Sequence, residues 1–175
     1  MSSEIVGAAG QAANASGRRT LVGPLLAVAG GVLIIMGVAL PWQDVTYALP
    51  DSVGRFVQSG LHVSEGVVAG LLGIVGIGAG IMWFTVSRRP GLWYALTVAV
   101  SGALVLDWAV RVSGQAGIGV LVSLLGALVG LAAVPFVATG SPARRLGVLA
   151  LTIVAGGVGL ILLMLIFRGS AHRYF

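Results

Sequence analysis

The residues best suited to take part in chemistry are an acidic and a basic residue that lie four positions apart in an apolar stretch. Asp107 precedes Arg111 by about one helical turn, which is the favourable order for an ion pair on a helix face. Asp107 is the only acidic residue within an apolar run, and a carboxylate isolated in lipid is costly. Beside Trp108, however, it is near enough to the span end to reach headgroup water. We expect a local ion pair that anchors the helix end; a proton- or ion-coupling role is the alternative.

Other reactive side chains are sparse. The chain has no cysteine, which excludes disulfides, thiolate nucleophiles and cysteine metal sites. His62 and Glu65, with Asp44 or Asp51, are of metal-ligating types, but a lone histidine in an exposed loop is usually solvated, and we expect no metal. The apolar runs contain no histidine for haem, and no nucleophile–base pair is evident. We therefore expect no cofactor and no enzymatic activity.

Composition indicates that these residues belong to a membrane protein. Of the 175 residues, 58% are hydrophobic and only 9% are charged, and the mean hydropathy is +1.06; soluble domains carry about 25% charged residues. Five apolar runs are each long enough to cross a hydrocarbon core of about 30 Å as helices. The predicted spans are 21–40, 66–86, 92–112, 118–138 and 146–167. The predicted fold class is an all-α transmembrane bundle, with four core spans and one further C-terminal helix.

The bundle, residues 18–168, is flanked by two tails. Residues 1–17 are small and polar, and we expect a disordered cytoplasmic tail there. Residues 169–175 form a short C-terminal tail. We expect the fifth run to cross fully, which places this tail outside; a re-entrant fifth run would return it to the cytoplasm.

The external loop, residues 41–65, has two open interpretations. Residues 51–52 can cap a short helix that lies flat on the membrane. Alternatively, residues 45–49 and 56–63 form a small hairpin, and the residue pattern does not decide between the two.

Arginine placement predicts the orientation. All ten basic residues are arginines, and three pairs flank the spans: Arg18, Arg19, Arg88, Arg89, Arg144 and Arg145. A cytoplasmic N-terminus puts all three pairs inside, as the positive-inside rule requires for a multi-pass plasma-membrane protein. Because the charges are dispersed and form no basic patch, the net charge of +5 predicts no nucleic-acid partner.

Four tryptophans lie near the ends of the predicted spans, where indoles favour the headgroup level. We expect them to be interface anchors: Trp42, Trp83, Trp93 and Trp108.

Small residues recur at helical spacing in the second and fourth spans, as in membrane helices whose backbones approach closely. The two stripes are Gly66, Gly70 and Gly73, and Gly119, Ser123, Gly126 and Gly130. They pack helices within one bundle, or one stripe faces outward and binds a second subunit.

Several features together resemble small multi-pass membrane proteins of actinobacteria, including the tryptophan-operon-associated transmembrane family. They are Pro41-Trp42 after the first span, Ser59-Gly60-Leu61 and Glu65-Gly66, Arg88-Arg89-Pro90, and Asp107 near the end of the third span. The resemblance covers about residues 21–138 and implies an integral membrane protein with no catalytic residues to transfer. That family generally has four spans, so the fifth run is a departure.

We therefore expect a non-catalytic accessory or assembly subunit, in contact with the lipid bilayer and with a membrane-protein partner or further copies of itself. The alternative is a small channel or transporter subunit that uses Asp107 and Arg111.

Overall fold

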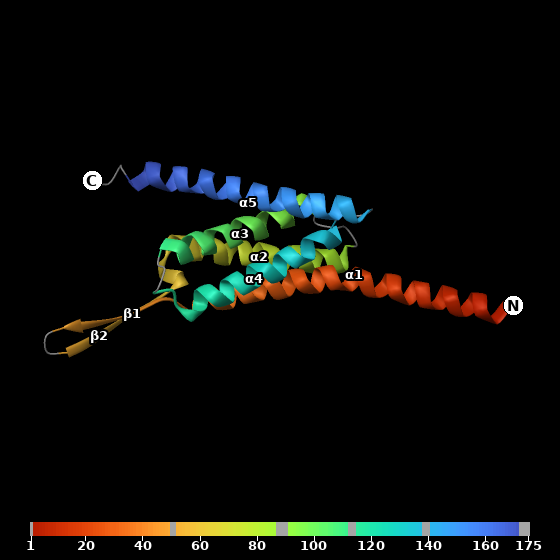
Figure 1. The fold of residues 1–175 in the computed structure, drawn as a ribbon, viewed down its shortest axis with the longest axis horizontal. Coiled ribbons are helices and arrows are strands. Elements are labelled where there is room, and N and C mark those ends of the chain that lie inside the picture. Colours follow the sequence, from red (N-terminus) through yellow and green to blue (C-terminus); the bar gives the residue numbers. More distant parts are fainter. Residues whose placement is uncertain (1, 50–51, 87–90, 112–114, 138–140, 172–175) are drawn as a thin grey trace.

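A computed structural model describes the backbone of residues 2–49, 52–86, 91–111, 115–137 and 141–171. Side chains are described within residues 21–161 of these ranges, apart from 49, 91, 92 and 160. The elements in chain order are α1 (Ser2–Ala39), β1 (Pro41–Leu49), β2 (Ser52–Ser59), a 3-10 turn η1 (Gly60–His62), α2 (Ser64–Thr85), α3 (Gly91–Arg111), α4 (Ile118–Val137) and α5 (Pro142–Ala171) (Figure 1).

The helices form a bundle in which α1 packs against α2 and α4, and α3 closes the ring by contacting the same two helices. Helix α5 lies outside this ring, mainly along α3 (Figure 1). Among the residues whose side chains are described, four segments are long and apolar enough to cross a membrane: Leu21–Ala39, Ser64–Thr85, Trp93–Arg111 and Ile118–Val137. The predicted helical bundle is thus confirmed, with four helices whose length and composition suit a membrane span. Residues 160 and 162–167 of the fifth run, 146–167, lie outside the residues with described side chains, and the crossing of this run stays a prediction.

The expectation of an all-α fold is wrong in one respect. Strands β1 and β2 pair antiparallel, so the external loop contains a hairpin and the alternative of a flat helix is wrong. Helix α1 ends at Ala39 and strand β1 begins at Pro41, because proline has no amide hydrogen to continue the helical ladder. Figure 1 shows the hairpin extending beyond one end of the bundle. We call this end of the molecule the hairpin end.

The helix boundaries also differ from the predicted tails. Helix α1 begins at Ser2, in place of a disordered segment over 1–17. This segment is rich in alanine and has no proline, so it extends a helix that the following apolar run has already nucleated. Helix α5 likewise continues to Ala171, into the predicted tail 169–175.

Glycines bring the backbones of α1 and α4 into direct contact. A Cβ atom on Gly126 would lie 2.7 Å from the amide nitrogen of Ile34 and 2.8 Å from the carbonyl oxygen of Gly30. A Cβ atom on Gly37 would lie 2.5 Å from the amide nitrogen of Ser123. These distances exclude any side chain larger than hydrogen unless a helix moves. The hydrophobic effect does not press helices together within lipid. Helix faces made of small residues instead allow close contact, so that dispersion forces hold the helices together.

The rest of the α4 stripe also faces the bundle. A Cβ atom on Gly119 would lie 2.5 Å from the carbonyl oxygen of Gly37, and one on Gly130 would lie 2.9 Å from a methyl group of Val98. The α4 stripe, Gly119 to Gly130, therefore packs inside one chain and is not a face for a second subunit.

The α2 stripe also faces inward, toward α1 and η1. Gly73 packs against Gly31 of α1, where a Cβ atom on Gly31 would lie 2.7 Å from the Gly73 carbonyl oxygen. Gly66 lies against the backbone of Gly60, and Gly70 is in ordinary contact range of Val38. The outward residues of α2 are larger and apolar, as at Leu71, Ile74 and Met82.

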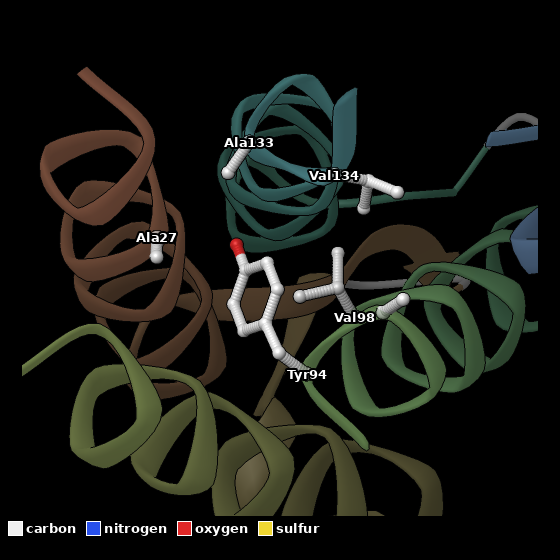
Figure 2. Packing of buried hydrophobic residues seen from close by; sticks show 6 residues of the cluster. Ala27, Tyr94, Val98, Ala133 and Val134 are labelled. Atoms are coloured by element: carbon white, nitrogen blue, oxygen red, sulfur yellow. The ribbon is translucent and has the colours of Figure 1, made fainter. Parts of the chain in front are cut away.

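Two apolar clusters fill the bundle. The cluster farther from the hairpin joins α1, α3 and α4 through Ala27, Tyr94, Val98, Ala133 and Val134 (Figure 2). In Figure 2 the Tyr94 hydroxyl points toward α4, where it donates to the Gly130 carbonyl oxygen at 2.9 Å. The second cluster lies toward the hairpin: Ile34, Val38, Trp42, Ala69, Val105 and Val120.

The α1–α4 contact gives a stability prediction. Gly126→Ala inserts a methyl group against backbone atoms, so we expect it to lower the free energy of unfolding in detergent by about 1–3 kcal/mol. Gly78→Ala is the matched control, because a Cβ atom there meets nothing within 4 Å. It should leave stability unchanged or raise it slightly through helix propensity. Equal stability of the two variants would contradict the close contact.

Candidate functional site

The first functional feature is the junction between α1 and the hairpin. The strand register pairs Pro41 with Ser59 and then Gln43 with Gln58, which leaves Trp42 as the extra residue of a β-bulge. A bulge redirects a side chain, and here the Trp42 ring is fully buried. Its Nε1 donates to the Gly37 carbonyl oxygen at 3.0 Å, which satisfies an acceptor near the end of α1.

A second set of contacts fixes the base of the hairpin to the segment before α4. Gly117 N donates to the Trp42 carbonyl oxygen at 2.8 Å, and Asp44 N donates to the Gln115 carbonyl oxygen at 3.2 Å. The side chain of Gln43 donates to that of Gln115 at 3.2 Å. The base of β1 is therefore hydrogen-bonded on both edges, which holds the hairpin in a fixed direction relative to the bundle.

The outer part of the hairpin presents an apolar face. The register pairs Val45 with Phe56, and Tyr47, two residues along β1, lies on the same side because side chains alternate along a strand. Tyr47 and Phe56 are each about half exposed, at 47% and 48%. We call Val45, Tyr47 and Phe56 the hairpin face.

The opposite side of the hairpin carries an ion pair. Arg55 Nε lies 2.8 Å from Asp44 Oδ1, and Arg55 Nη2 lies 2.5 Å from Oδ2. This bidentate hydrogen bonding holds the pKa of the Asp44 carboxyl below its ordinary value of 3.8.

The second functional feature is a charged cluster at the hairpin end of α2 and α3. Asp107 and Arg111 form the expected ion pair along one face of α3. Arg111 Nη1 also lies 3.3 Å from Glu65 Oε1, and Ser64 Oγ donates to Glu65 Oε2 at 2.8 Å. We call Glu65, Asp107 and Arg111 the charged cluster.

A groove opens beside the charged cluster. It has a volume of about 670 Å³ and lies between α3, α4 and α5. Small residues of α3 contribute to the groove wall, and leucine and isoleucine side chains contribute most of the rest. Asp107 is the one charged residue among the described lining residues. The residues are Ala99, Gly102, Ala103, Leu106, Asp107, Val110, Leu124, Ala127, Leu128, Leu131, Ile153 and Gly157.

The tryptophans differ in their surroundings. Trp93 is 80% exposed, as an interface anchor should be, whereas Trp42 is buried and Trp83 packs beside Tyr94 with ring centroids 6.5 Å apart. Trp108 lies against Trp42, with centroids 6.1 Å apart. Trp42 and Trp83 are therefore buried packing residues and not exposed anchors. For Trp42, the bulge turns the ring into the bundle.

Other sequence-predicted residues are less informative. Arg144 and Arg145 are exposed at the start of α5, whose first turn is capped by Ser141. The other predicted pairs, at 18–19 and 88–89, lie outside the described side chains.

The candidate metal ligands that the structure describes each have a different partner, and Asp51 lies outside the described residues. Asp44 pairs with Arg55, Glu65 pairs with Arg111, and His62 Nδ1 lies 2.9 Å from Ser59 Oγ. Among the described residues, no three acidic or histidine side chains gather around one point.

Sequence reasoning missed the role of Glu65 in the charged cluster. The available signal was topological: Glu65 precedes the second span and Arg111 ends the third, so two consecutive antiparallel spans bring both residues to one membrane surface. The hairpin register, which brings Asp44 and Arg55 to one side of the hairpin as diagonal neighbours, had no comparable signal.

No family model matches this chain, and the comparisons with curated proteins and with solved structures likewise gave no match. The resemblance to actinobacterial membrane proteins stays a prediction, and the functional argument depends on geometry alone.

The ion pair of the hairpin gives a titration prediction. We expect the Asp44 carboxyl to titrate below pH 3.8, because its charged form accepts the Arg55 hydrogen bonds. A depressed pKa in the folded state means that the pair stabilises the hairpin above pH 3.8 and that this contribution is lost as pH falls through the folded-state pKa. In Arg55→Gln the pKa should rise toward 3.8, as measured by carboxyl ¹³C NMR.

Arg144→Gln is the control for this titration, because Arg144 is an exposed arginine on α5, away from the hairpin. It should leave the Asp44 pKa unchanged. An Asp44 pKa that is insensitive to Arg55→Gln would show that the pair does not form.

Proposed function

We propose that this protein is a non-catalytic accessory or assembly subunit of a membrane, which holds a partner protein through its hairpin. The observation that carries the proposal is the combination of an exposed apolar hairpin face with a hairpin base fixed to the bundle. A face held in one direction loses little conformational entropy when a partner binds.

The position of the hairpin favours a protein partner over lipid. The hairpin extends past the end of the bundle along its long axis, away from the level of the spans (Figure 1). Aromatic residues such as Tyr47 and Phe56, half exposed outside the membrane, are the residue types that dominate binding energy at protein interfaces. Beyond the base, where β1 bonds residues 115 and 117, the strands of a two-stranded sheet also offer outer edges for strand addition.

The alternatives have less support. The described charged side chains of the hairpin end, Asp44, Arg55, Glu65, Asp107 and Arg111, are joined in ion pairs, which leaves them poorly suited to acid–base chemistry. The groove beside Asp107 is otherwise apolar among the described residues, which disfavours an ion or polar-solute path.

The hairpin face gives a binding prediction. Full-length tagged protein, purified in mild detergent from its native membrane, should retain a partner at a fixed stoichiometry. Phe56→Ser should lower its recovery about tenfold or more, because an aromatic anchor contributes about 2 kcal/mol or more to binding.

Thr46→Ser is the matched control, since Thr46 is exposed on the opposite side of the same hairpin. It should leave recovery unchanged. A monodisperse monomer with no partner, or a partner retained equally by both variants, would count against the proposal.

We propose that the protein crosses the plasma membrane five times with its N-terminus in the cytoplasm. Helix α5 has 30 residues and follows α3 toward the hairpin end (Figure 1). At 1.5 Å per residue it is about 45 Å long, sufficient to cross. This topology places the arginine pairs in the cytoplasm and both the hairpin and the C-terminus outside.

The absence of native cysteine makes this topology directly testable. Single-cysteine variants Thr46→Cys and Ser170→Cys should both react with a membrane-impermeant maleimide on intact cells, whereas Ser3→Cys should react only after lysis. Protection of Ser170→Cys in intact cells would indicate a re-entrant fifth run and four crossings.

A further inference from the structure

We propose that the groove between α3, α4 and α5 binds one acyl chain of an aminophospholipid from the leaflet at the hairpin end, with the headgroup held by the charged cluster. The inference is independent of the hairpin's partner and concerns a different surface of the protein.

The walls of the groove suit a hydrocarbon chain. Ala99, Gly102 and Ala103 of α3 leave space beside the helix, and Leu128 of α4 and Ile153 of α5 are more than half exposed at its borders. These residues lie within or beside membrane-spanning helices, so the groove faces lipid and not water. A volume of about 670 Å³ lies within the range of small-molecule sites.

The length of the groove favours a lipid over a partner helix. Along α3 its lining extends from Ala99 to Val110, a rise of about 16 Å at 1.5 Å per residue. One leaflet contributes about 15 Å of the hydrocarbon core. The groove therefore extends from the level of the charged cluster to about the bilayer midplane, which is the depth of one acyl chain. A transmembrane partner helix would need a contact surface through both leaflets.

The charges at the groove entrance favour an aminophospholipid. The charged cluster contains two carboxylates and one guanidinium, so it retains one net negative charge. Asp107 lines the groove itself, and about half of the Arg111 side chain is exposed. An aminophospholipid carries an ammonium group that can donate to the carboxylates and a phosphate that can accept from Arg111. An anionic lipid without an amine has no cationic group to pair with the second carboxylate of the charged cluster.

Two glycines provide a matched pair of variants. A Cβ atom on Gly157 meets nothing within 4 Å, and this residue lines the groove. Gly78 also meets nothing within 4 Å, but it faces outward from α2 and does not line the groove. Gly157→Leu therefore places a bulky side chain in the groove from a position where the first added carbon meets no packed atom, and Gly78→Leu adds the same side chain elsewhere on the helical surface.

The experiment is native mass spectrometry of the full chain, reconstituted with equimolar phosphatidylethanolamine and phosphatidylglycerol that carry identical acyl chains. We expect one phosphatidylethanolamine to be retained per chain, in preference to phosphatidylglycerol. Gly157→Leu should lower this retention about fivefold or more, and Gly78→Leu should leave it unchanged. The melting temperatures of both variants verify that they remain folded.

A second pair of variants tests the headgroup. Asp107→Asn should reduce the preference for phosphatidylethanolamine about tenfold, because it removes a charged hydrogen-bond acceptor. Asp44→Asn, an equivalent change in the hairpin, should leave the preference unchanged.

Three results would overturn the proposal. The first is equal retention of the two lipids by the natural sequence. The second is equal loss in the two leucine variants, which would indicate general lipid coating. The third is a dimer of this chain that Gly157→Leu abolishes, which would assign the groove to a second copy.

Discussion

The backbones of α1 and α4 approach so closely that hydrogen atoms take the place of side chains at Gly37 and Gly126. In lipid there is no hydrophobic force to press helices together, so the contact area available at short range decides which helices pair. Once α4 is seated on α1, the segment that leads into α4 lies beside the end of α1, where Gly117 can bond to Trp42. The direction of the hairpin is thus a consequence of glycine packing within the spans.

Polar chemistry is concentrated where the membrane ends. The Asp44–Arg55 pair lies in the hairpin, and the charged cluster lies where α2 begins and α3 ends. The interior retains a few hydroxyl groups that bond to helix backbones, such as Tyr94 to Gly130 and Thr152 to Val148. This separation follows from the cost of isolated charge in hydrocarbon.

The sequence was sufficient to predict features that depend on composition and helical spacing. The four described spans, the Asp107–Arg111 ion pair and the Pro41 helix end each follow from local rules. The features that could not be predicted from the sequence depend on contacts between residues that are distant along the chain. Trp42 is buried because a bulge and residues 115–117 meet beside it, and Arg111 reaches Glu65 from another helix. The groove was also not predictable, since its walls come from three helices whose relative placement no periodicity encodes.

The peripheral place of α5 has a consequence for biogenesis. Every fully buried member of the two apolar clusters belongs to a segment that precedes α5 in the chain. Because synthesis proceeds from the N-terminus, the ring of α1 to α4 is available to assemble in the translocon before α5 leaves the ribosome. Helix α5 then docks onto a finished surface, with Gly156 against Ala99 and Gly159 against Val100. Docking of α5 can thus be timed separately from the folding of α1 to α4.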